Sequence, residues 1–107
     1  MKYKRILLKL SGEVLLNRQT AQCIDSNVVK MMAEKIKAVR GMGVDVAVVL
    51  GGGNIFRGAI GQELGIGRSA GDYMGMLATV INAIALQNAL ESLDVPTRVQ
   101  TAIAIHE

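Results

Sequence analysis

The chain has 107 residues and a formal net charge of +3; half of its residues are apolar and 3% are aromatic. This composition excludes an intrinsically disordered chain. The sequence contains no uninterrupted apolar run of about 18 residues, so we expect no membrane span. The single cysteine, Cys23, cannot form an internal disulfide, which favours the reducing cytoplasm. One cysteine and one histidine also argue against a zinc site built by the protein, and we expect no metal ligands.

The charge is distributed unevenly along the chain. Residues 1–40 carry nine Lys or Arg and three acidic residues, whereas residues 41–107 carry three and six. The basic side chains recur at helical spacing and few aromatic residues lie among them, which is typical of a solvated helix face. Nucleic acid is therefore not an expected partner.

The first half of the chain predicts a strand and then a helix. Tyr3–Leu10 is a short apolar run, which predicts a buried strand. Apolar residues then recur at helical spacing after Asp25 or Ser26, either of which can serve as the N-cap. We expect this helix to end at Gly41–Gly43, where glycine permits a left-handed backbone.

Residues 44–50 are rich in β-branched side chains, which favours a central parallel strand covered on both faces. Together with the preceding strand and helix, this segment predicts a βαβ unit with a right-handed crossover. The glycine-rich residues 54–70 predict an ordered loop, and a loop of this length in a compact domain is usually functional.

The last part of the chain predicts a long helix and a third strand. Asp72–Leu93 suits one helix that is apolar on most sides, with Asp72 as its cap or as a favourable charge near its N-terminus. Because a small sheet covers one side only, we expect the remaining apolar side to meet another subunit. Residues 98–105 predict a strand, and nothing after it completes a domain, so we expect the chain to be the first part of one.

Candidate functional residues follow both of the first two predicted strands. Lys9, Ser11 and Gly12 end the first strand, and Gly51–Gly53 end the second, with Arg57 shortly afterwards. Ligands bind open α/β sheets outside the carboxyl ends of the strands, where glycine lets phosphate groups approach backbone N–H groups. Two cations and two glycine turns at one edge therefore predict a crevice that holds several phosphates.

The familiar phosphate motifs do not account for this pattern. Gly53 and Gly58 have the spacing of a P-loop, but Ala59 and Ile60 replace its Lys and Ser/Thr. The segment 65–70 fits G-x-G-x-x-A but lacks the preceding strand of a dinucleotide-binding unit.

Each candidate also has a purely structural interpretation. Lys9 could keep a strand soluble, Gly51–Gly53 could form a plain turn, Arg57 could be a surface charge, and Asp72 could only cap its helix.

Three blocks of sequence resemble the bacterial uridylate kinases of the amino acid kinase superfamily. They are YKRILLKLSGE at 3–13, GGGNIFRG at 51–58 and DYMGMLAT at 72–79. The resemblance implies an α/β fold, a three-layer αβα sandwich with a mostly parallel sheet. It also implies that residues 1–107 are the N-terminal, UMP-side portion of such a domain, without the C-terminal portion that binds the ATP base.

The resemblance implies ATP-dependent phosphorylation of UMP to UDP, with Mg²⁺, in pyrimidine nucleotide synthesis. It assigns catalytic roles to Lys9 and Arg57, and UMP binding to Gly52 and Asp72. The residues that it assigns to ATP are Lys9, Leu10, Ser11, Gly12, Gly53 and Arg57.

The resemblance further implies a homohexamer built from dimers and allosteric regulation by GTP and UTP. Residues 17–23 lack glycines that many relatives have there, and Gln87–Asn88 replace the Arg-Asp of some relatives, so GTP activation stays open. Because the base site would lie elsewhere, we expect the chain alone to be inactive. Two alternatives stay open: a non-catalytic phosphate-binding or oligomerisation module, and another amino acid kinase that phosphorylates a carboxylate or carbamate.

Overall fold

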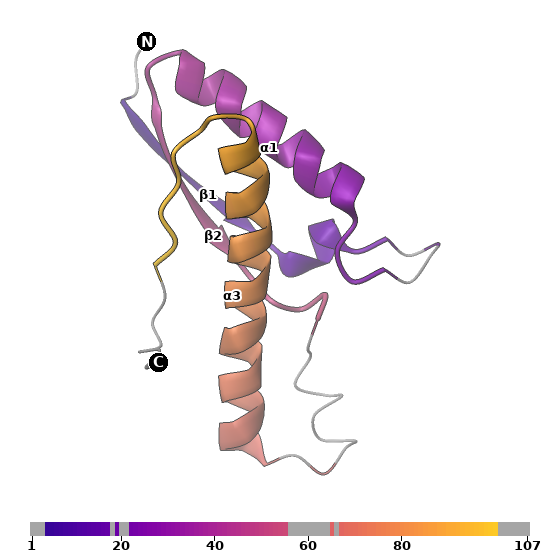
Figure 1. Cartoon of the computed structure of the whole chain (residues 1–107). Coiled ribbons are helices and arrows are strands. Elements are labelled where there is room, and N and C mark those ends of the chain that lie inside the picture. The colour runs from indigo at the N-terminus through magenta and orange to yellow at the C-terminus, as the bar shows by residue number, and fades with distance from the viewer. Residues whose placement is uncertain (1–3, 18, 20–21, 56–64, 66, 101–107) are drawn as a thin grey trace.

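The computed structural model describes residues 4–17, 19, 22–55, 65 and 67–100. Two strands, two long helices and a short 3₁₀ turn make up the described fold, with α3 crossing in front of the strands in Figure 1. In chain order the elements are β1 (Arg5–Leu10), η1 (Gly12–Leu15), α1 (Ser26–Gly41), β2 (Asp45–Leu50) and α3 (Arg68–Ser92).

The two strands are parallel, which confirms the strand–helix–strand prediction. Their register pairs Arg5 with Asp45 at one end and Leu10 with Leu50 at the other. Directly beyond this pair, the backbone N–H of Gly51 donates to the carbonyl oxygen of Leu10 at 3.0 Å. The two strands therefore end together, and the segments that follow them begin at the same edge of the sheet.

Both helices cover the same face of the sheet. Alternate residues of each strand are partly buried or exposed, and the partly buried side chains of β2 pack on the helices. On the other face, Leu7 is 61% exposed and Val49 is 50% exposed. The expectation that β2 is covered on both faces is therefore not met, because α1 and α3 share one side. The buried cluster consists of Leu15, Val29, Ala33, Ile36, Leu86 and Leu90.

The predicted ends of α1 are confirmed. Of the two candidate caps, Asp25 is the one used: its carboxylate accepts hydrogen bonds from the backbone N–H groups of Asn27 at 2.8 Å and Val28 at 3.4 Å. After the helix, Gly43 has a φ of +82°, a conformation that costs a residue with a side chain more than it costs glycine.

The long helix α3 begins four residues earlier than the sequence predicted. Gly67 occupies the N-cap position without a side-chain bond, and the N–H of Gly71 donates to its carbonyl at 2.9 Å. Asp72 therefore lies in the second turn, and its predicted role as the cap is wrong. Glycine is tolerated at an N-cap, so the helix needs no capping side chain to start there.

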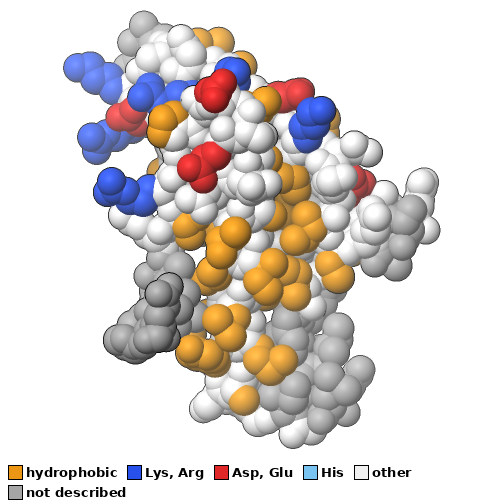
Figure 2. Space-filling view, viewed as in Figure 1, with side chains coloured by type: hydrophobic (Ala, Val, Ile, Leu, Met, Phe, Trp, Pro, Cys, Tyr) orange, Lys and Arg blue, Asp and Glu red, His pale blue; other side chains and the backbone are white. Residues whose placement is uncertain are grey.

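One stripe of α3 is buried, and its other sides are apolar but exposed. Ala78, Asn82, Leu86 and Leu90 recur every four residues and face the core, each at most 4% exposed. Figure 2 shows the hydrophobic side chains gathered over α3, away from most of the charged ones. The exposed apolar residues of this helix are Tyr73, Met74, Met76, Leu77, Ile81 and Ile84. We call them the apolar face of α3.

The segment Ser69–Ser92 is also long and apolar enough to span a membrane, which differs from our reading of the sequence. Core helices of soluble proteins can have the same length and composition. Only 22% of this apolar window is buried, but the buried stripe of α3 is in contact with α1 and β2. We therefore interpret α3 as a packing helix.

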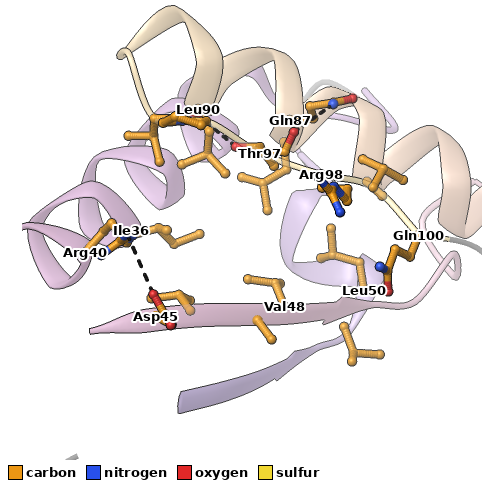
Figure 3. Close-up of a pocket in the computed structure, with 18 residues that line it drawn as sticks. Ile36, Arg40, Asp45, Val48, Leu50, Gln87, Leu90, Thr97, Arg98 and Gln100 are labelled. Carbon is orange, nitrogen blue, oxygen red and sulfur yellow. Dashed lines mark hydrogen bonds and ion pairs between the residues drawn. The ribbon is translucent and has the colours of Figure 1, made fainter. Parts of the chain in front are cut away.

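The predicted third strand is absent from the part of residues 98–105 that the structure describes. Val95–Gln100 has no regular structure, and the sheet of the described residues holds β1 and β2 only. A cavity of about 580 Å³ lies between β2, α3 and this segment (Figure 3). The amide of Gln87 donates to the carbonyl of Thr97 at 3.3 Å, which ties the segment to α3 instead of to the free edge of β2.

Candidate functional site

The first glycine turn follows β1 and bends the chain away from the sheet. The Oγ of Ser11 accepts a hydrogen bond from the N–H of Glu13 at 3.3 Å, and its carbonyl accepts one from the N–H of Val14 at 3.2 Å. These bonds cap and start η1. The turn keeps Ser11 exposed and Gly12 buried at the carboxyl end of the strand.

Gly12 is where the two glycine turns touch. A Cβ atom at this position would lie 2.5 Å from Oδ1 of Asn54 and 2.7 Å from the carbonyl oxygen of Gly51. Both distances are far below van der Waals contact, and one neighbour is backbone. Glycine is therefore required here because the turn after β1 rests directly on the turn after β2.

In the second glycine turn, Gly51–Gly53, the last two glycines have different surroundings. A Cβ on Gly52 would lie 2.7 Å from Cβ of Ala78 and 3.0 Å from the carbonyl oxygen of Gly75, so this glycine allows the turn to pack on α3. The nearest atom to a Cβ on Gly53 is Cγ of Glu13, at 3.7 Å, which is ordinary contact. Packing therefore explains the glycine at 52 but does not by itself require a glycine at 53.

A pair of asparagines joins this turn to α3. Asn54 and Asn82 are 8% and 0% exposed, and their side-chain amides bond to each other twice, at 2.7 and 3.1 Å. Asn82 also donates to the carbonyl of Gly51 at 2.8 Å, and Asn54 donates to the carbonyl of Cys23 at 2.8 Å. The sequence reading missed this asparagine pair. The sequence did contain a signal for it: Asn82 is the one polar residue among buried helix positions that recur every four residues, with Ala78 before it and Leu86 after it.

Lys9 occupies the penultimate position of β1, opposite Val49. Its side chain is exposed and belongs to the sheet face that the helices leave uncovered. The strand thus delivers a cation to the end of the sheet where both glycine turns begin. Arg57, the second predicted cation, lies outside the described residues.

Asp72 is exposed in the second turn of α3. It lies three residues before Gly75, whose carbonyl oxygen is one of the atoms that approach Gly52 most closely. Residues three apart are neighbours on a helix surface, so Asp72 lies one turn of α3 before the residue whose backbone packs on Gly52. Its predicted contact with a ligand stays a prediction.

The arrangement is suited to holding an anion rather than to attacking a substrate. It combines two glycine turns, a hydroxyl at Ser11 and a cation at Lys9. Glu13 adds a carboxylate, with Oε1 at 3.9 Å from the Cβ position of Gly53. Within the ranges that the structure describes, no three His, Cys, Asp or Glu residues come together as a metal site.

Comparisons with known proteins identify the family of the chain. The Amino acid kinase family matches residues 4–107. A uridylate kinase from Limosilactobacillus reuteri is 52% identical over the whole chain, which spans 44% of that protein. The UMP kinase of Ureaplasma parvum superposes with a TM-score of 0.79 and 43% identity, covering 89% of this chain and 40% of its own.

A second solved structure gives the same result. The UMP kinase of Bacillus anthracis superposes with a TM-score of 0.77 and 39% identity, over 86% of this chain and 37% of its own. The chain therefore spans less than half the length of these relatives. Since the family match extends over nearly all of its residues, the chain belongs to the amino acid kinase family.

Proposed function

We propose that this chain is the phosphate-binding, UMP-side portion of a cytoplasmic UMP kinase, which transfers a phosphoryl group from ATP to UMP in pyrimidine nucleotide synthesis. One observation carries the proposal: the turns at Gly12 and at Gly51–Gly53 meet at the carboxyl edge of a parallel sheet. The similarity to uridylate and UMP kinases supports the same nucleotide as substrate.

In this proposal the first turn binds ATP, and the second turn contacts both substrates. Gly52 and Asp72 contact UMP, with the Asp72 carboxylate on its ribose side. This places UMP between the second turn and the start of α3, where Asp72 stands beside Gly75. The residues that bind ATP are Lys9, Leu10, Ser11, Gly12, Gly53 and Arg57.

Catalysis in this proposal consists of positioning and charge neutralisation. Phosphoryl transfer needs aligned phosphates and stabilised negative charge more than it needs a protein nucleophile. Lys9 and Arg57 supply the positive charge, and the glycine turns supply close backbone contact. Mg²⁺ would be held mainly by the phosphate oxygens of ATP, as such ions commonly are, and would offset part of their negative charge.

The apolar face of α3 is the proposed contact between subunits. It exposes six large apolar side chains that the chain itself does not cover. Burying such a surface is favourable at roughly 25 cal/mol per Å². We propose a homohexamer built from dimers.

The relatives are more than twice as long as this chain, which bears on where the adenine of ATP binds. Because this chain spans 44% of the similar uridylate kinase, we place the adenine site in sequence beyond these residues. We call the longer protein the complete enzyme. The 107-residue chain alone then holds phosphates without turnover.

Product analysis tests the proposed reaction. The complete enzyme, supplied with ATP and Mg²⁺, is expected to convert UMP to UDP and to leave glutamate, aspartate and carbamate unphosphorylated. The 107-residue chain, freed of contaminating kinase, is expected to yield no UDP. Phosphorylation of a carboxylate or carbamate instead of UMP would overturn the substrate assignment. UDP formed by the chain alone would overturn the division into two portions.

A further inference from the structure

The asparagine pair, Asn54 and Asn82, is polar and buried, and it lies between α3 and the loops that contain Gly51 and Cys23. Asn82 is fully buried on an otherwise apolar stripe of α3, between Ala78 and Leu86. A buried amide is costly unless its donors and acceptor are satisfied. Here both N–H groups of Asn82 are used, toward Gly51 and Asn54, and its oxygen accepts from Asn54.

The orientation of both amides is fixed by backbone carbonyls. Asn82 must present its NH₂ group to the carbonyl of Gly51, and Asn54 must present its own to the carbonyl of Cys23. A rotated amide would place an oxygen against a carbonyl oxygen and leave a donor unused. The pair therefore has one arrangement, and it joins α3 to two loops that are distant in sequence.

The same pair forms the surface on which the first glycine turn rests. The atoms closest to a Cβ on Gly12 are Oδ1 of Asn54 and the carbonyl oxygen of Gly51. Asn82 hydrogen-bonds both of these oxygens, at 2.7 and 2.8 Å. Asn82 thus holds both oxygens on which Gly12 rests, and adds to the backbone hydrogen bond from Gly51 to Leu10 in fixing the two turns relative to each other.

We propose that Asn82 is a positioning residue, whose amide, paired with Asn54, sets the spacing of the two glycine turns that receive the substrate phosphates. This inference rests on the proposed function for the identity of the ligand. Asn82 itself does not touch the nucleotide. Its effect is preorganisation: the turns hold their phosphate-binding shape before the ligand arrives.

The test compares Asn82→Ala with Asn88→Ala in the 107-residue chain, because Asn88 is an exposed asparagine on the same helix. Hydrogen exchange is followed for peptides covering both turns and for a peptide of α1, at a temperature where each variant is folded. Binding of Mg²⁺-ATP and of UMP is measured by calorimetry. Asn82→Ala is expected to speed exchange in both turns roughly tenfold, and to leave α1 unchanged.

The same variant is expected to weaken nucleotide binding roughly 10- to 100-fold, and Asn88→Ala to change neither quantity. A residue that served stability alone would lower the melting temperature and spare the binding of the folded chain. If Asn82→Ala does not fold, Asn54→Ala in the loop gives the same comparison. Unchanged exchange in the turns of either folded variant would overturn the inference.

The two proposals can fail separately. If the unaltered chain binds neither nucleotide, the proposed function of these residues fails, while exchange in the two turns still decides whether Asn82 positions them. If nucleotides bind and Asn82→Ala binds them equally well, the positioning inference fails and the proposed function stands.

Discussion

The two glycine turns at the strand ends and the apolar face of α3 differ in how completely their groups are packed or hydrogen-bonded within the chain. At the turns, Gly12 and Gly52 fit with no space for another carbon atom, and both buried amides are fully hydrogen-bonded. Along the apolar face, side chains such as Ile81 and Ile84 remain about half exposed. The turns are determined by contacts among the described residues, whereas those residues leave the apolar face of α3 partly uncovered.

The largest expected effect concerns the charge at the turns. Lys9→Ala in the complete enzyme is expected to lower kcat on the order of 10²- to 10³-fold, because a preorganised charge at the transferring phosphate is lost. Stability should hardly change, since the side chain is exposed. Steady-state kinetics and thermal unfolding check both. The control is Lys37→Ala on α1, and equal rates for the two variants would contradict the role of Lys9.

The next effect separates two neighbouring glycines. Gly52→Ala is expected to lower the free energy of unfolding by about 1–3 kcal/mol, because its Cβ would overlap Ala78 and the backbone of α3. Gly53→Ala has room for its methyl group and should leave stability nearly unchanged. It should weaken ATP binding instead. Urea unfolding and calorimetry distinguish the two, and similar destabilisation by both would show that the turn is less tightly packed than described.

The apolar face of α3 is tested by a charge placed on it. Ile81→Glu is expected to dissociate the complete enzyme into smaller species, because a carboxylate would be buried at the subunit contact. Met31→Glu is a matched control, since Met31 on α1 is exposed to the same extent, 49%. Sedimentation velocity measures the assembly. If Ile81→Glu sediments like the unaltered enzyme, this face is not the contact between subunits.

The smallest expected effect lies at the opposite end of the sheet. The carboxylate of Asp45 forms ion pairs with Arg5 at 3.6 Å and with Arg40 at 3.7 Å. All three side chains are more than half exposed. Solvent screens such pairs, so Asp45→Asn is expected to cost less than about 1 kcal/mol of stability. Denaturant unfolding at low and high salt checks this. A larger, salt-independent loss would mean that the pairs are more than surface contacts.

Local pattern alone located most of the fold. The apolar run before Gly12, the β-branched run before Gly51 and the cap at Asp25 each act within a few residues, so their elements were found with bounds within two residues. The parallel pairing followed from the helix between them. The same reasoning placed the two glycine turns at one edge, because parallel strands end on the same side.

Tertiary structure decided what depends on residues distant in sequence. The start of α3 moved away from Asp72 because Gly67 can serve as an N-cap without a side-chain bond. The third strand was not realised in its described part, and Thr97, just before it, is hydrogen-bonded to Gln87 of α3. Neither outcome follows from the local spacing of apolar residues.

The site shows the same division most clearly. The sequence by itself determined that glycines, Lys9 and Ser11 would lie at the carboxyl ends of the strands, since composition and order are local properties. Only the fold showed that Gly12 rests on Asn54, that Gly52 rests on α3, and that Asn82 holds the turns together. The physical reason is that close approach and amide pairing join residues about 30 to 40 positions apart, and no periodicity in the chain specifies such contacts.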